Sequence, residues 1–229
     1  MSQKNIWEKE YRSPKLITKD NNPQSFFIHL VKIFKKKLNF YINGKKVLDL
    51  GCGIGRNSNY LASLGAEEVI GVDISKTAIN IAKKRSNQLG ISNVFFEEND
   101  IGSSNYNYKD NYFDLVLDIT SSNSLNFKER NNYLKEVFRV LKKDSYLVVR
   151  AFNKNGDKNA HKLLQKFPGK EKDTYIIPEL GLTEKVFSYE DFLDTYKDFS
   201  LINLERKTSY TRFLGQNYKR NFFLTIFKK

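Results

Sequence analysis

Apolar residues recur along this chain in two alternating spacings. Residues 24–38 place Phe27, Leu30 and Phe34 three or four positions apart, which predicts the buried face of a helix. Short continuous apolar runs, typical of strands that are buried on both faces, follow further along the chain. These runs are 46–50, 69–72, 94–96, 115–117 and 146–149. Segments with helical spacing lie between most of them, so the pattern predicts a doubly wound α/β fold, a mostly parallel sheet with helices on both faces.

The end of the chain has a different pattern. Two β-like runs, 199–208 and 221–227, follow each other with no convincing helix between them. They predict an antiparallel final strand pair that closes one edge of the sheet, joined by about a dozen residues. Residues 151–187 are polar and show no clear period, so we expect an irregular insertion or lid there. A chain of 229 residues suits one domain.

A glycine-rich turn follows the first predicted strand. Gly51, Gly53 and Gly55 carry no Cβ atoms, so the backbone can bend sharply and a ligand can approach it closely. In open α/β sheets, ligands bind beyond the carboxyl ends of the strands, where the strand order reverses. A dinucleotide-binding turn would carry its last glycine at the position of Arg56. Asp49, two residues before the first glycine, is a poor neighbour for a phosphate and suits a cationic amino group.

The segment from Val47 to Gly55, which reads VLDLGCGIG, resembles motif I of class I S-adenosylmethionine-dependent methyltransferases. The resemblance continues through Gly71–Ser75, Asn99–Ile101 and Phe113–Asp118, and it covers approximately residues 45–150. It implies S-adenosylmethionine as the cofactor and S-adenosylhomocysteine as the product. It also implies a Rossmann-like sheet of seven strands, mostly parallel, whose last strand is antiparallel.

The resemblance also assigns roles to single residues. Asp73 would accept hydrogen bonds from the two ribose hydroxyls and Asp100 from the adenine amino group, while Asp49 would meet the cofactor's ammonium group. Ile74 and Ile101 would sandwich the adenine ring. The predicted cofactor-binding set is completed by Gly51, Gly53, Gly55 and Asp118, the last under the methionine portion.

We expect no fixed catalytic residue, because the sulfonium methyl is already activated and the protein mainly aligns the acceptor with it. Trp7 and Tyr11, four residues apart, share a helical face and could form a lid whose rings attract the sulfonium. They could equally fasten the N-terminus to the core. Arg150, at the end of the fifth strand, is expected either on the acceptor side or in an exposed ion pair. No metal site is expected.

The resemblance divides this single domain into four segments. We expect an N-terminal helical lid or cap over residues 1–44 and the cofactor-binding core over residues 45–150. The irregular insertion or lid spans 151–187. A C-terminal helix with the closing strands spans 188–229.

The chain is strongly basic, with a net charge of +13, which favours a nucleic-acid partner. Yet 30 of its 39 basic residues are Lys and only 9 are Arg, the residue that reads bases and grips phosphates. An RNA methyltransferase is therefore the second hypothesis.

The lone Cys52 cannot form an intramolecular disulfide, which fits a reducing cytoplasm. Residues 1–15 lack the apolar run of a signal peptide, and no stretch is long enough to predict a membrane span.

The acceptor is predicted from weaker similarities. The fourth strand ends in Asp118–Ser121, without the Asn-Pro-Pro-aromatic signature of amino-directed DNA methyltransferases. Glu184–Phe192 and Arg220–Lys229 resemble the tails of small-molecule methyltransferases related to tellurite-resistance enzymes. We therefore expect a small-molecule acceptor. Two further hypotheses stay open: a non-catalytic protein that binds S-adenosylmethionine, and an aminopropyltransferase, whose polyamine would need more acids than Asp118.

Overall fold

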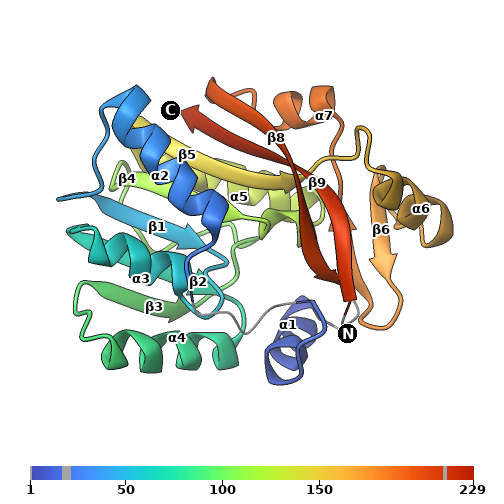
Figure 1. Ribbon diagram of the computed structural model, residues 1–229, viewed down its shortest axis with the longest axis horizontal. Coiled ribbons are helices and arrows are strands. Elements are labelled where there is room, and N and C mark those ends of the chain that lie inside the picture. Colours follow the sequence, from blue (N-terminus) through green and yellow to red (C-terminus); the bar gives the residue numbers. More distant parts are fainter. Residues whose placement is uncertain (1, 17–21, 214–215) are drawn as a thin grey trace.

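A mixed sheet of seven strands, in the order β3-β2-β1-β4-β5-β9-β8, forms the centre of the molecule (Figure 1). The computed structural model describes residues 2–16, 22–213 and 216–229, without the side chain of residue 212. The strands are β1 (Lys46–Leu50), β2 (Glu68–Asp73), β3 (Val94–Glu98), β4 (Phe113–Ile119), β5 (Leu141–Phe152), β6 (Thr174–Ile177), β7 (Leu182–Lys185), β8 (Ser200–Phe213) and β9 (Gln216–Lys228). The helices are α1 (Gln3–Arg12), α2 (Ser25–Leu38), α3 (Arg56–Ser63), α4 (Lys76–Gln88), α5 (Phe127–Val140), α6 (Lys158–Lys166) and α7 (Tyr189–Thr195), with a 3-10 turn at Ser122–Ser124.

Strands β1 to β5 pair in parallel, whereas β9 lies antiparallel to both β5 and β8. In β4, Leu115, Val116 and Leu117 are all buried, as expected for a strand covered on both faces. The strand order reverses between β1 and β4, and ligands of such sheets bind at that point, beyond the carboxyl ends. The predicted doubly wound, Rossmann-like α/β fold with an antiparallel final pair is confirmed.

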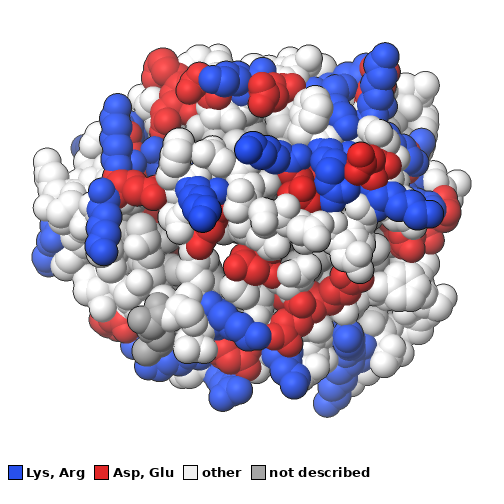
Figure 2. Space-filling view, turned by 180° about the vertical axis from the view of Figure 1, so that it is seen from behind, with Lys and Arg blue, Asp and Glu red and all other residues white. Residues whose placement is uncertain are grey.

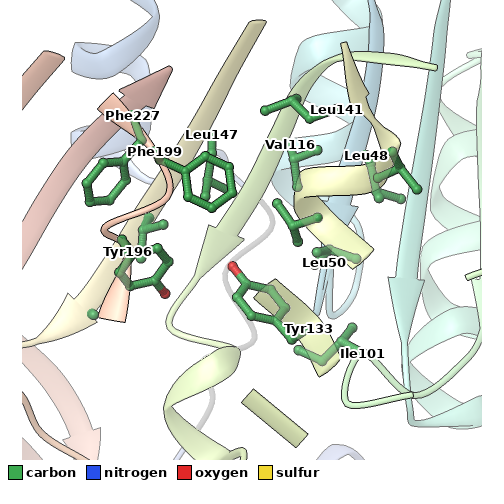
Figure 3. Close-up of a cluster of buried hydrophobic side chains, with 14 of the residues drawn as sticks. Leu48, Leu50, Ile101, Val116, Tyr133, Leu141, Leu147, Tyr196, Phe199 and Phe227 are labelled. Carbon is green, nitrogen blue, oxygen red and sulfur yellow. The ribbon is translucent and has the colours of Figure 1, made fainter. Parts of the chain in front are cut away.

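Helices cover both faces of the sheet (Figure 1). Phe27 of α2, Leu61 of α3 and Ile79 of α4 belong to the core on one face. Val137 of α5 and Phe192 of α7 belong to the core on the other face. Among the described residues, no helix is both long and apolar enough to cross a membrane. Figure 3 shows the second of these cores, which includes Leu48, Leu50, Val116, Tyr133, Leu147 and Tyr196.

The helix ends follow local signals in the sequence. The Ser75 side chain accepts a hydrogen bond from Ala78 N and so begins α4, directly after β2. Asn126 and Glu129 form a capping box at the start of α5. Gly65 has a φ of 85° just after α3, a left-handed conformation that favours glycine at the end of a helix.

The closing strands are longer than the apolar pattern predicts. β8 and β9 pair continuously until Phe213 lies opposite Gln216, so the expected dozen-residue connection is itself largely strand. The outer part of this β8–β9 hairpin is mostly polar, and Thr208 Oγ1 donates to Asn221 Oδ1 at 2.8 Å. Its few apolar side chains include Phe213 and Tyr218, which stack at 5.0 Å and pack against a small core. Because these apolar positions are sparse, periodicity ended the predicted strands at residues 208 and 221.

Residues 151–187 are not irregular, contrary to the prediction. They contain the end of β5, helix α6 and the two-stranded sheet β6–β7. Asp157 begins α6 by accepting from Asn159 N and Ala160 N, both at 2.9 Å. Its other oxygen accepts from Arg220 Nε at 3.0 Å in a buried ion pair. β6 and β7 have only four residues each and α6 has nine, so each element is too short for its apolar spacing to be recognised from the sequence.

Candidate active site

A cavity of about 310 Å³ lies at the carboxyl ends of β1, β2 and β4. Its wall comes from α1, from the loops after β1 to β4, from the end of β5 and from β8. Of the twelve residues predicted for the site, ten line this cavity. They are Trp7, Tyr11, Asp49, Gly51, Gly53, Asp73, Ile74, Asp100, Ile101 and Arg150.

The glycine-rich turn after β1 has no room for a side chain at Gly51 or Gly53. The N–H groups of Gly51 and Cys52 donate to Val72 O at 2.7 and 2.9 Å, which ties the turn to the end of β2. Gly51 has a φ of 71°, and a Cβ there would lie 2.0 Å from Ser121 Oγ. Gly53 has a φ of 56°, and its Cβ would lie 2.7 Å from the Tyr11 hydroxyl. The turn therefore requires glycine both for its backbone conformation and for the space beside it.

Asp49, in β1, is a buried acid in the cavity wall. Its Oδ2 accepts a hydrogen bond from Ser58 Oγ of α3 at 2.6 Å. Burial raises the pKa of Asp49 to about 6 against the effect of that hydrogen bond, and the negative charges of Asp73 and Asp118 raise it further. A cationic group in the cavity would stabilise the ionised form of Asp49.

Asp73, the last residue of β2, presents both carboxylate oxygens at the turn. Oδ1 accepts from Ser75 N at 2.9 Å, and Oδ2 accepts from Gly53 N at 3.0 Å. The Tyr11 hydroxyl also donates to Oδ2, at 3.5 Å. Burial raises the pKa of Asp73 to about 6 in spite of these donors. Two fixed oxygens at one strand end can accept from a pair of neighbouring hydroxyls.

The third acid, Asp100, lies after β3 at an exposed edge of the cavity. Its Oδ1 accepts from Gly102 N at 2.8 Å, which orients the carboxylate. Ile74, in the loop after β2, and Ile101, in the loop after β3, also line the cavity. An open edge with two apolar side chains and one acceptor suits a flat heterocycle that carries an amino group.

Helix α1 forms one side of the cavity with Trp7 and Tyr11. Glu8 fastens this helix to the start of α4, because its Oε2 accepts from Ser75 Oγ at 2.7 Å and from Thr77 N at 3.1 Å. At the other side of the cavity, Gln3 Nε2 donates to Ser124 O at 2.6 Å. The predicted helical face of Trp7 and Tyr11 is therefore present, and α1 both covers the cavity and fastens the N-terminal segment.

A family model of the methyltransferase domain matches residues 42–184, which is more than half of the chain. The chain belongs to the class I S-adenosylmethionine-dependent methyltransferases. A solved S-adenosylmethionine-dependent methyltransferase from Methanosarcina mazei is 28% identical, with a TM-score of 0.74, and the match covers 91% of this chain and 98% of that one.

Curated relatives of this methyltransferase match over shorter stretches. An uncharacterised methyltransferase of Schizosaccharomyces pombe is 37% identical over 109 residues, which are 48% of this chain and 72% of that protein. The 2-heptyl-1-hydroxyquinolin-4(1H)-one methyltransferase of Mycobacteroides abscessus is 33% identical over 108 residues, 47% of this chain and 46% of that protein. The closer similarity to tellurite-resistance-related enzymes stays a prediction.

Two residues predicted to bind the cofactor do not line the methyltransferase cavity. A Cβ on Gly55 would lie 2.6 Å from the Phe96 ring, so this glycine lets α3 pack on the sheet. Asp118 is fully buried and lies opposite Leu50 in the sheet register, so its side chain is on the α5 face. There it accepts from Tyr133 Oη at 2.9 Å. Its other oxygen accepts from the backbone N–H groups of residues 121 and 122, which shapes the loop that lines the cavity.

Other residues of the methyltransferase cavity were not predicted from the sequence. Arg56 and Asn57 begin α3 directly after the glycine turn. Their position next to that motif could have indicated that they belong to the site. Ser121 follows β4 and lies against Gly51. Tyr210 and Thr211 reach the cavity only because β8 is long, and no local motif marks them.

Proposed function

We propose that this chain transfers the methyl group of S-adenosylmethionine to a small-molecule acceptor and that both bind in the cavity described above. The buried carboxylates Asp49 and Asp73, whose pKa values are raised to about 6 beside the glycine-rich turn, support it most directly. A carboxylate in such a place gains from a cationic or hydrogen-bond-donating ligand more than an exposed one does.

The donors and acceptors of the cavity fit this cofactor. Asp49 receives one hydroxyl hydrogen bond in the wall and would hold the ammonium group of the methionine portion. Asp73 would accept from the ribose hydroxyls, one of which takes the place of the Tyr11 hydroxyl. Asp100 would accept from the adenine amino group, with Ile74 and Ile101 against the ring.

When bound, S-adenosylmethionine would supply a methyl group on a positively charged sulfur: a lone pair of the acceptor would form the new bond to the methyl carbon as the sulfur–methyl bond breaks and S-adenosylhomocysteine leaves. The residues of the chain then have to bind the two molecules, hold them in line and exclude water. Helix α1 covers the cavity and serves the last of these tasks. We assign no general base, because one is needed only where the acceptor atom carries a proton.

A small acceptor agrees with the dimensions of the site. The cavity has a volume of about 310 Å³ and Trp7 and Tyr11 of α1 stand in its wall, which leaves little space for a polymer. The Mycobacteroides abscessus relative is named for a heptyl-hydroxyquinolinone, which is a small molecule. We therefore favour a small-molecule acceptor over RNA.

The substitution Asp73→Ala tests the proposed cofactor site. It should weaken S-adenosylmethionine binding by about 1.5–3 kcal/mol, the range for a hydrogen bond to a charged group. Isothermal titration calorimetry measures this, with Asp194→Ala as the control, since Asp194 is exposed at the end of α7 and pairs only loosely with Lys197 at 3.4 Å. Unchanged affinity would place the ribose elsewhere, and absence of binding to the unaltered chain would refute the proposal.

A further inference from the structure

Arg150 is a buried cation in the wall of the cavity. It lies near the end of β5, between Ile119 of β4 and Leu224 of β9 in the sheet register, and its side chain and backbone together are only 8% exposed. Its carbonyl accepts from Thr120 N at 2.8 Å, which fixes the backbone beside the loop that follows β4. The residue is therefore held in place by the sheet and not by a mobile loop.

The guanidinium of Arg150 is enclosed by aromatic rings. Its central carbon lies 3.4 Å from the centre of the Phe222 ring and 4.6 Å from that of the Phe26 ring. Its Nη2 donates to Ser209 Oγ of β8 at 3.1 Å. These contacts stabilise a cation. Among the described residues, however, a side chain accepts a hydrogen bond from only one of the five N–H groups of this guanidinium.

Within the described part of the chain, the charge of Arg150 has no counterion. Among the residues that the structure describes, no Asp or Glu forms an ion pair with it. Burial lowers the pKa of Arg150 to about 9, and the positive charge of Arg56, another residue of the cavity wall, lowers it further. A buried charge without a partner is costly, so a site that keeps one gains when an anion enters.

The geometry points to an acidic acceptor: Arg150 binds the carboxylate of a small organic acid, which is the molecule to be methylated. This inference rests on the proposed function, which assigns the acids Asp49, Asp73 and Asp100 to the cofactor. A guanidinium presents a flat fork of N–H groups that matches both oxygens of a carboxylate. Phe26 and Phe222 exclude water around it, which strengthens such an ion pair.

A purely structural role for Arg150 predicts a different behaviour. If the guanidinium only filled the space between the two rings, a neutral side chain of similar length would serve as well, and no ligand would depend on its charge. Arg150→Met keeps length and apolar contact while it removes the charge. Arg150→Lys keeps the charge and loses the planar fork.

The test compares benzoate with benzamide, a pair of nearly equal shape of which only the first is an anion. Each is titrated calorimetrically into the full chain saturated with S-adenosylhomocysteine. We expect benzoate to bind and Arg150→Met to weaken it by roughly tenfold or more, as for loss of a charged hydrogen-bond partner. Arg150→Lys should restore part of the affinity. The matched control is Arg206→Met, because Arg206 is an exposed arginine of β8 that stacks on Tyr189 outside the cavity.

Two results would overturn the inference. One is benzamide binding as tightly as benzoate to the unaltered chain. The other is benzoate affinity that Arg150→Met leaves unchanged while the variant still folds, as judged by its thermal unfolding. The titration with S-adenosylhomocysteine is recorded separately for each variant, so failure of the cofactor proposal shows as loss of that binding and is distinguishable from failure at Arg150.

Discussion

Asp49 and Asp73 are carboxylic acids that the fold has withdrawn from water. Burial raises the pKa of each to about 6, against the hydrogen bonds that Ser58 gives to Asp49 and that the N–H groups of Ser75 and Gly53 give to Asp73. Between about pH 4 and about pH 6, the folded protein therefore keeps protons on these acids that the unfolded chain has released. The stability that these acids contribute declines as the pH rises through this range. A cationic or hydrogen-bond-donating ligand has the opposite preference, because it favours the ionised form.

The affinity for S-adenosylmethionine should consequently rise with pH and level off above about pH 7. Below the pKa, each proton released on binding changes the association constant by up to about tenfold per pH unit. Calorimetric titrations between about pH 5 and about pH 8 measure the slope. The Asp49→Asn variant has no ionisable group at this position, so the slope of its log association constant against pH should be about half that of the unaltered chain. A flat profile for the unaltered chain would show that neither acid changes its protonation on binding.

Among the elements, helix α1 is joined to the start of α4 through the side chain of Glu8. Glu8 accepts from Ser75 and Thr77 at the start of α4, where the helix dipole also favours a negative charge. Burial opposes ionisation of Glu8, but hydrogen bonds from Thr77 and Ser75 hold its pKa at about 2. Glu8 therefore stays ionised near neutral pH, and its hydrogen bonds to α4 should persist there.

Glu8→Ala should detach α1 without disturbing the sheet. Loss of these hydrogen bonds should lower the free energy of local opening by about 1–3 kcal/mol. Hydrogen–deuterium exchange would show faster exchange in residues 3–12, while β1 and β4 keep their protection. Lys9→Ala, at an exposed position of the same helix, is the control and should exchange as the unaltered chain does. Equal exchange in both variants would mean that α1 is held by its apolar contacts.

The elements also show which parts of this fold and site a sequence can predict. β1, β2 and β4 were predictable because each is a continuous apolar run, and the site residues after β1 and β2 follow from a motif of fixed spacing. The outer β8–β9 hairpin was not predictable, because its residues are mostly polar and its few apolar side chains, such as Phe213 and Tyr218, show no clear period. Tyr210 of the cavity wall was missed for the same reason. Asp118 does not line the cavity, because the register that places it opposite Leu50 puts its side chain on the α5 face, a relation between strands that no local pattern contains.

At the scale of the whole molecule, the net charge of +13 is spread over a mixed surface. Figure 2 shows Lys and Arg side chains interspersed with Asp and Glu on one face. Several of the basic residues form ion pairs, among them Lys4 with Glu98 and Lys142 with Asp114. Such a surface attracts nucleic acid weakly and without preference for sequence.

Binding of transfer RNA should therefore be weak and strongly dependent on salt. We expect a dissociation constant weaker than about 1 µM near physiological salt, within the range of non-specific binding. A filter-binding titration at two or more salt concentrations measures it, with a duplex DNA of similar length as the control. Tight binding that prefers RNA and survives added salt would favour an RNA methyltransferase instead.

The two halves of the sheet contribute to different parts of the cavity. The loops after β1, β2 and β3 supply the proposed contacts with the methyl donor, whereas the end of β5 and the edge strand β8 supply Arg150, Tyr210 and Thr211. Under the proposed function, mutations that accumulate in the β8–β9 hairpin would alter what is methylated while the donor is still recognised. In evolutionary terms, this scaffold would diversify its chemistry by changing one half of the sheet and inheriting the other.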